Sequence, residues 1–174
     1  MFSSGNMDER IRMAKISNKK ETVVDLFAGI GYFTLPMAVY SKPKKIYACE
    51  LNPVAFDYLC ENIVLNDVTN IVDPIEGNNR ENAPKNIADR VVLGYFGETR
   101  KFLSTALSCL KDAKGIIHYH DKFPDKNVPD KPLKEIQEAV KNHDRKFEFI
   151  NQKLVKHYAP GISHYVFDIG IDER

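Results

Sequence analysis

The chain has 174 residues, of which 43% are hydrophobic and 28% charged, and its formal net charge is +1. This length indicates one domain that buries its own core, and this composition excludes wholesale disorder. No apolar run approaches the ~20 residues of a membrane-spanning helix, and the first residues lack the apolar core of a signal peptide. A charge so close to zero does not by itself indicate a nucleic-acid partner.

Stretches typical of strands alternate with stretches typical of helices along most of the chain. Strands are expected over 22–27, 44–49, 71–75, 90–93, 115–120, 146–156 and 163–171, and helices over 31–40, 53–64, 98–110 and 132–143. Residues 121–131 are polar and contain two prolines, which predicts a loop. The alternation predicts an α/β fold with a Rossmann-like, doubly wound sheet of seven strands, the last of them antiparallel.

The first 20 residues differ from the rest because they are polar and basic. They are expected to form a lead-in segment, 1–20, before a domain that spans 21–174, and the abrupt start suggests a fragment of a longer protein. The three cysteines, Cys49, Cys60 and Cys109, lie in apolar contexts without metal or disulfide spacing. Such cysteines are typical of reduced thiols in the cytoplasm.

The strongest local signal follows the first expected strand, where residues 25–33 read DLFAGIGYF. Gly29 and Gly31 allow a tight turn at the strand end, where open α/β sheets bind their ligands. A dinucleotide fingerprint would need a third glycine where Thr34 stands, so a pyrophosphate cradle is disfavoured. A nucleoside without phosphate, such as S-adenosylmethionine (AdoMet), suits this turn better. An ordinary strand–helix turn is the alternative.

Polar side chains also follow the next expected strands. Glu50, about twenty residues beyond the turn, can accept both hydroxyls of a ribose. Asn78 can bond an adenine amine, although a plain Asn-Gly turn explains it equally well. His118 and His120 share one face of a strand, and without a third ligand they are a poor metal site. Hydrogen bonding near a cleft and ordinary buried histidines both remain open for them.

These residues resemble the first two motifs of class I AdoMet-dependent transferases, at 25–33 and 50–53. Residues 2–10, FSSGNMDER, resemble the element before the AdoMet domain in two sister families of tRNA enzymes. One family contains guanosine-37 N1-methyltransferases, and the other contains the aminocarboxypropyltransferases of the wybutosine pathway. The stretches 89–95, 115–120 and 155–160 continue the match over essentially the whole chain.

Several positions favour the aminocarboxypropyltransferases. The methyltransferases carry an Asn-Leu-Pro-like element after the fourth strand, where this chain has Gly94-Tyr95-Phe96. Tyr32, where the methyltransferases usually have proline, and the His-Tyr-His at 118–120 also resemble the aminocarboxypropyltransferases. Asn78 departs from both families, which often have aspartate there. Methylation of guanosine 37 and a non-catalytic AdoMet- or RNA-binding module are the alternatives.

The resemblance implies transfer of the 3-amino-3-carboxypropyl group of AdoMet to a modified guanine of 4-demethylwyosine type, at position 37 of tRNA(Phe). The second product would be 5′-methylthioadenosine. The enzyme would be a cytoplasmic monomer that contacts the anticodon loop and uses no metal. Glu9 matches the general base of the methyltransferases and is the first candidate for a proton acceptor, with His118 the second. Phe33, Tyr95 and Phe96 are candidates for stacking on the base. The implied AdoMet-binding residues are Ser3, Arg10, Asp25, Phe27, Gly29, Gly31, Glu50, Asn78 and Asn79.

Overall fold

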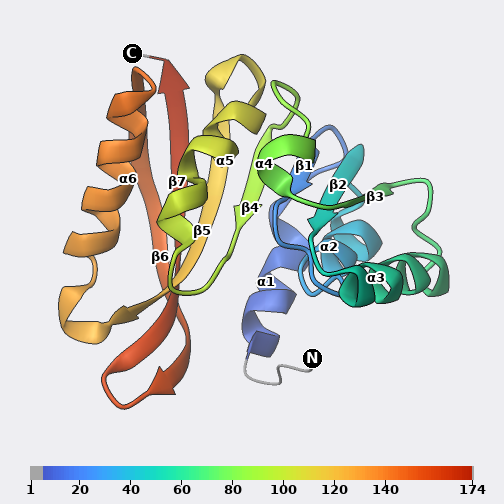
Figure 1. The fold of residues 1–174 in the computed structure, drawn as a ribbon, viewed down its shortest axis with the longest axis horizontal. Coiled ribbons are helices and arrows are strands. Elements are labelled where there is room, and N and C mark those ends of the chain that lie inside the picture. The colour runs from blue at the N-terminus through green and yellow to red at the C-terminus, as the bar shows by residue number, and fades with distance from the viewer. Residues whose placement is uncertain (1–5, 174) are drawn as a thin grey trace.

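Seven strands form one mixed sheet in the computed structural model, which describes residues 6–173 (Figure 1). Its spatial order is β3-β2-β1-β4-β5-β7-β6. The pairs among β1 to β5 are parallel, whereas β7 runs antiparallel to both of its neighbours. The predicted fold class is therefore confirmed. The strands are β1 (Thr22–Asp25), β2 (Lys45–Glu50), β3 (Val72–Glu76), β4 (Arg90–Leu93), β5 (Gly115–Pro124), β6 (Arg145–Ala159) and β7 (Ile162–Glu173).

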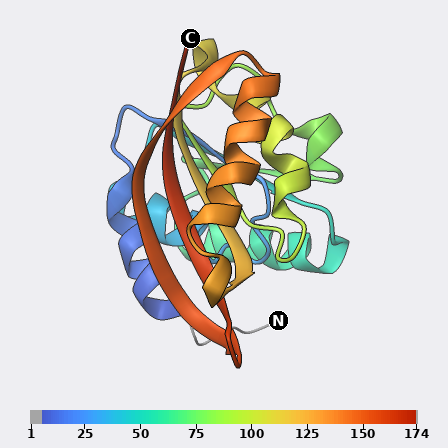
Figure 2. The same ribbon diagram turned by 90° about the vertical axis from the view of Figure 1, so that its left-hand side faces the viewer.

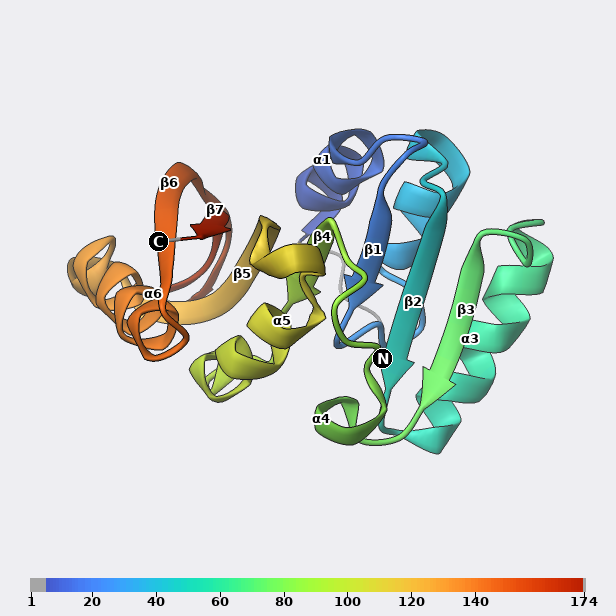
Figure 3. The ribbon, with the colours of Figure 1, turned by 90° about the horizontal axis from the view of Figure 1, so that it is seen from above.

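Helices cover both faces of this sheet, and Figure 3 shows α1 and α5 on opposite sides. The helices are α1 (Met7–Ile16), α2 (Thr34–Pro36), α3 (Pro53–Leu65), α4 (Asn79–Asn82), α5 (Leu103–Cys109) and α6 (Asp130–Asn142). A π-helical turn, Met37–Ser41, continues α2, and a 3-10 turn, Thr99–Phe102, precedes α5. Two more 3-10 turns are Lys111–Ala113 and Asp125–Asn127.

The core is divided into two layers by the sheet, because successive strand residues point to opposite faces. Val23 belongs to the same buried cluster as Met13 of α1 and Leu59 of α3, whereas its neighbour Val24 belongs to the cluster on the other face, with Leu103 of α5 and Ile136 of α6. The two long strands β6 and β7 run the height of the molecule beside α6 (Figure 2). None of the helices described between residues 6 and 173 is long and apolar enough to cross a membrane.

Local sequence explains where α3 begins. Asn52 caps the helix, with its side-chain oxygen accepting from the backbone N–H groups of Val54 and Ala55. Pro53 occupies the first helical position, where its missing N–H has no intrahelical partner to lose. Glu50 and Asn52 are thereby held at fixed positions between β2 and α3.

Several details differ from the prediction. Helix α1 was not expected; it docks through the fully buried Met13 and a hydrogen bond from Ser41 Oγ to the Ala14 carbonyl, 2.7 Å. The loop expected over 121–131 is wrong at its start, because β5 continues to Pro124, paired with Ile162 of β7. The helix expected from residue 31 begins only at Thr34. The division at residue 20 stays a prediction.

Candidate functional site

A tight turn follows β1. Gly29 and Gly31 have φ values of +58° and +100°, in the left-handed region that favours glycine. The carboxylate of Asp25 accepts hydrogen bonds from the Phe27 N–H at 3.2 Å and from Thr34 Oγ at 2.7 Å, so it ties the end of β1 to the start of α2. Burial raises the pKa of Asp25 to about 6. The turn is thus built around a buried carboxyl group.

Replacing Gly31 with alanine is expected to loosen this turn. The added Cβ would lie 2.6 Å from Cγ of Leu35, and alanine disfavours the observed φ. We expect a loss of about 1–3 kcal/mol in the free energy of unfolding, with weaker AdoMet binding. Urea denaturation and calorimetric titration measure the two effects. Gly161→Ala is a suitable control for the φ strain, since Gly161 also has a positive φ but open space around it.

Glu50 closes β2 directly beside this turn. One carboxylate oxygen accepts from the Gly29 N–H and the other from the Asn52 N–H, both at 2.8 Å. A carboxylate oxygen has two lone pairs, so each can still accept a hydroxyl proton. The arrangement suits the two hydroxyls of a ribose placed over the turn.

Two asparagines follow β3 and differ in what they do. Asn78 caps α4, accepting from the Arg80 N–H at 3.1 Å and donating to Glu81 at 3.0 Å. Asn79 is buried and donates to the Leu26 carbonyl at 2.6 Å, which fixes it against the end of β1. Its side-chain oxygen is buried and has no hydrogen-bond partner among residues 6–173. Such an acceptor fits a ligand with an amine, as adenine has.

Aromatic and basic side chains border the turn. Phe27 stacks on Tyr95, with ring centroids 5.4 Å apart, and meets Phe102 edge-on at 4.8 Å. On the other side, Arg10 and Tyr32 line a groove, with the guanidinium 5.7 Å from the ring centroid. Gly31 lines the same groove. Arg10 is therefore positioned to meet an anionic group close to the turn.

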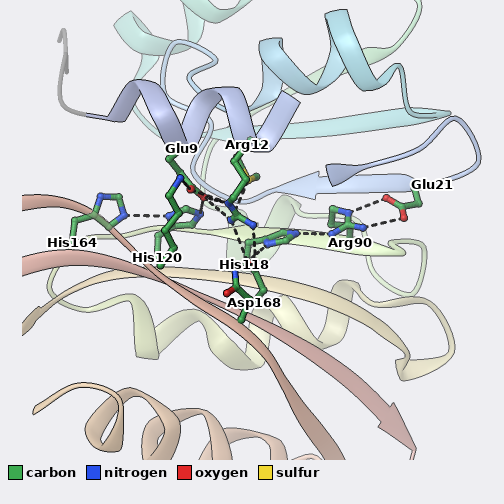
Figure 4. Close-up of polar contacts among 11 residues, drawn as sticks. Glu9, Arg12, Glu21, Arg90, His118, His120, His164 and Asp168 are labelled. Atoms are coloured by element: carbon green, nitrogen blue, oxygen red, sulfur yellow. Dashed lines mark hydrogen bonds and ion pairs between the residues drawn. The ribbon is translucent and has the colours of Figure 1, made fainter. Parts of the chain in front are cut away.

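A buried chain of polar side chains connects α1 to the sheet (Figure 4). Arg12 donates to both carboxylate oxygens of Glu9, at 2.6–3.1 Å, and to both of Asp168, at 2.7 and 3.2 Å. Asp168 also bonds Nδ1 of His118 at 2.5 Å. Nε2 of His118 lies 2.7 Å from a guanidinium nitrogen of Arg90, whose other donors reach Glu21.

The hydrogen bonds of these polar side chains fix the protonation of His118. Arginine can only donate, so Nε2 of His118 accepts from Arg90 and Nδ1 carries the proton that Asp168 accepts. Burial lowers the pKa of His118, which agrees with a neutral ring. Both ring nitrogens are occupied, and this placement does not favour His118 as the proton acceptor that the sequence suggests. Its position instead indicates a structural part in holding Asp168.

His120 and His164 form a second buried group next to this chain. Their facing nitrogens, Nδ1 of His120 and Nε2 of His164, are 3.2 Å apart. Phe33 stacks on His120 at 4.9 Å, and Phe96 meets His164 edge-on at 4.6 Å. Nε2 of His120 lies 3.9 Å from a carboxylate oxygen of Glu9. Burial is the main cause that lowers both pKa values, that of His164 to about 3.

The structure brings the expected residues together in two groups. The first group lies at the carboxyl ends of β1 to β3 and consists of Asp25, Gly29, Gly31, Glu50 and Asn79. The other expected AdoMet residues lie beside it, except Ser3, which is outside the described residues. Glu9 of α1 and His118 of β5 are linked through Arg12 and Asp168. Sequence reasoning missed Arg12, Asp168 and His164. The alternation of residues along the expected last strand could have placed His164 and Asp168 on one face. No short sequence motif identified either residue as functional.

A parallel sheet extended by one antiparallel strand, with a glycine turn after β1 and a carboxylate after β2, defines the fold of class I AdoMet-dependent transferases. The chain matches the TRM5/TYW2 methyltransferase domain over residues 1–150. It is 48% identical over 168 residues to the tRNA(Phe) (4-demethylwyosine(37)-C(7)) aminocarboxypropyltransferase of Methanocaldococcus jannaschii, covering 97% of this chain and 67% of that protein.

Other relatives and solved structures agree with this match. The enzyme of the same description from Pyrococcus horikoshii is 43% identical, with 98% of this chain and 61% of that protein covered. The crystal structure of M. jannaschii TYW2 in complex with AdoMet has a TM-score of 0.96 at 46% identity, and covers 100% of this chain and 78% of that one. The P. horikoshii TYW2 structure in complex with MeSAdo has a TM-score of 0.95 at 42% identity, covering 100% and 65%.

The chain therefore belongs to the TRM5/TYW2 family, and within it to the aminocarboxypropyltransferases, as the sequence predicted. It spans about two thirds of the length of these two relatives.

Proposed function

We propose that this chain transfers the 3-amino-3-carboxypropyl group of AdoMet to a 4-demethylwyosine-type base at position 37 of tRNA(Phe). The observation that carries the proposal is the arrangement of Glu50, the glycine turn and the side-chain oxygen of Asn79, which has no partner among residues 6–173. This arrangement suits a nucleoside. Thr34 stands where the third glycine of a pyrophosphate cradle would be. The similarity to the M. jannaschii aminocarboxypropyltransferase over 97% of the chain supports the same reaction.

Different residues around the turn would bind different parts of AdoMet. Glu50 would bind the ribose and Asn79 the adenine amine, which fixes the nucleoside over the ends of β1 to β3. Arg10 is suited to the carboxylate of the methionine arm, because a guanidinium can bind a carboxylate with two hydrogen bonds. AdoMet supplies a sulfonium with three carbons open to attack, and the protein selects one by orientation. The chain's role is therefore to fix the methionine arm with its Cγ toward the target base.

The partner in this proposal is the anticodon loop of tRNA. A target base must leave its stack to reach a protein site. Tyr95 and Phe96, both 49% exposed in the loop after β4, are suited to stack on it. Phe33 is less suited, because it is less exposed than Tyr95 and Phe96. We place the enzyme in the cytoplasm, acting as a monomer.

Methyl transfer to guanosine 37 is the second candidate. The tRNA (guanine(37)-N(1))-methyltransferase Trm5b of Pyrococcus abyssi is 36% identical over 99% of this chain, which covers 49% of that protein. Against it stands the sequence Gly94-Tyr95-Phe96, where the resemblance to the methyltransferases would require an Asn-Leu-Pro-like element.

AdoMet labelled isotopically at two different positions, the methionine carboxyl and the methyl group, distinguishes the two candidate reactions. With tRNA(Phe) that carries 4-demethylwyosine, we expect label from the methionine carboxyl to enter the RNA and label from the methyl group to leave in methylthioadenosine. Methyl label entering an unmodified guanosine-37 transcript would instead identify a methyltransferase. AdoMet and RNA binding without any transfer would identify a non-catalytic module.

A further inference from the structure

Two lysines flank a buried histidine on the face of the sheet that α1 covers. Lys122 of β5 is the register partner of His164 on β7, and His164 is the register partner of Lys156 on β6. Register partners on neighbouring strands point to the same face of a sheet, so Lys122 and Lys156 form a row, the lysine row, on either side of His164. Burial lowers the pKa of His164 to about 3, so its ring is neutral and the lysines supply the charge.

The lysine row lies near the edge of the sheet that also carries the glycine turn. Strand β5 is parallel to β4, which is parallel to β1, so the carboxyl ends of these strands share one edge. Pro124, at the carboxyl end of β5, pairs with Ile162, the first residue of β7. The closed end of the β6–β7 hairpin therefore lies at this edge too, and it extends past the other elements in Figure 2.

Two aromatic contacts connect the lysine row to the proposed AdoMet site. Phe33, which follows the glycine turn, stacks on His120 at 4.9 Å, and Lys122 comes two residues after His120 on the same face. Phe96, in the loop after β4, meets the ring of His164 edge-on at 4.6 Å. A base stacked on the half-exposed Phe96 would therefore lie next to the lysine row.

The lysine row lies in a local excess of positive charge. Residues 149–167 contain no aspartate or glutamate. On the same face, the carboxylates of Glu9 and Asp168 are buried and both accept hydrogen bonds from Arg12. Lys153 adds a further cation, 3.5 Å from Glu9. Because the whole chain has a formal net charge of only +1, its attraction for an anion depends on such a local excess.

An exposed aromatic ring accompanies this charge. Tyr158, 59% exposed near the hairpin turn, packs against Lys122, whose ammonium nitrogen is 4.1 Å from the ring centroid. Cations combined with aromatic rings are typical of surfaces that bind single-stranded nucleic acid, since the cations contact phosphates and the rings contact bases. Two strand spacings, roughly 10 Å, separate Lys122 from Lys156, so the two lysines can bind separate phosphates.

We propose that the lysine row binds phosphates next to the target nucleotide in the anticodon loop of tRNA, while the base itself stacks on the loop after β4. The proposal rests on the proposed function and adds to it the surface that holds the RNA backbone. Phosphate contacts fix the register and orientation of a nucleic acid without reading its sequence. The lysine row therefore positions the loop, and recognition of the modified base depends on other side chains.

The salt dependence of tRNA binding, measured by fluorescence anisotropy, tests these phosphate contacts. Each phosphate neutralised on a single strand contributes about 0.7 to the slope of log K against log salt concentration. We expect Lys122→Gln and Lys156→Gln each to reduce this slope by about 0.7 and to weaken binding about fourfold at ~0.15 M salt. The double variant should bind about 15-fold more weakly. The isolated anticodon stem–loop should show the same loss as whole tRNA(Phe).

Lysines at the opposite edge of the sheet provide the matched control. Lys20 and Lys44 are exposed and precede β1 and β2, so Lys20→Gln/Lys44→Gln loses the same net charge at the amino ends of the strands. It should bind tRNA within twofold of wild type, as should Lys122→Arg/Lys156→Arg, which keeps the charge. AdoMet affinity should stay within twofold in every variant. If the glutamine double variant folds poorly, the two single variants supply the slopes.

The outcomes separate this proposal from the proposed function. An unchanged slope, an equal loss in the opposite-edge control, or a loss seen with whole tRNA but not with the stem–loop would overturn the lysine row as the phosphate-binding surface. A chain that transfers the group with a KM for tRNA unaffected by the double substitution would refute the lysine row alone. A chain that shows the expected slopes but transfers no group would refute the proposed function and leave the RNA-binding surface in place.

Discussion

Replacing Asp168 with asparagine is expected to lower the free energy of unfolding by about 3 kcal/mol. Asp168 is buried and accepts from Arg12 on one side and from His118 on the other. Asparagine has the same shape but turns an N–H₂ group toward one of these donors. Of its two carboxylate partners, Arg12 then keeps only Glu9 to balance its positive charge. In addition, a buried N–H donor of Arg12 or His118 loses its acceptor.

The pH dependence of this loss follows from the ionisation of Asp168. Burial opposes ionisation, but the His118 hydrogen bond and the charge of Arg12 outweigh it and hold the pKa of Asp168 below its usual value of 3.8. A carboxyl with a depressed folded-state pKa stabilises the fold above its unfolded pKa and loses that contribution as pH falls. The difference between wild type and Asp168→Asn should therefore be full at pH 7 and shrink below about pH 4.

Urea denaturation of matched variants measures this effect. Asp172 lies four residues further along β7 and pairs with Lys114 at 3.2 Å on the exposed surface. Asp172→Asn should leave stability at pH 7 unchanged within error, because solvent screens exposed pairs. Equal effects of the two substitutions would show that the buried chain under α1 does not stabilise the fold.

This buried chain also marks the limit of what the sequence predicts. The glycine turn and Glu50 were accessible from the sequence, because short motifs at strand ends determine them and the alternation of strands places those ends together. Arg12 and Asp168 are 156 residues apart in the chain. Their contact depends on α1 docking over β5 and β7, and the first 20 residues carry no strong apolar periodicity that would predict a docked helix.

Glu9 and His118 show the same limit in another way. The resemblance to the tRNA enzymes pointed to Glu9, and the position on an expected strand pointed to His118, but neither could show which partners these residues bind. Only the fold shows that Arg90 and Asp168 occupy the two nitrogens of His118. The length of β5 was underestimated for a similar reason, since its last residues form a strand only because β7 pairs with them as far as Ile162.

Replacing Glu50 with alanine is expected to weaken AdoMet binding by at least 100-fold, or about 3 kcal/mol. The substitution removes two charge-assisted acceptors for the ribose and also the acceptor for the Gly29 N–H. Calorimetric titration with AdoMet measures the change. Glu76 is the register partner of Glu50 on β3 and is exposed. Glu76→Ala should bind AdoMet with an affinity within twofold of wild type.

A loosened turn and a lost ribose contact would both weaken binding, and a ribose analogue separates them. For wild type, removing the 2′-hydroxyl from methylthioadenosine should reduce affinity by about tenfold, since one hydrogen bond to a charged acceptor is lost. For Glu50→Ala the same removal should cost almost nothing, because the acceptor is already gone. If both proteins lose affinity equally, another group binds the ribose, and Glu50 acts only by holding Gly29 and Asn52 in place.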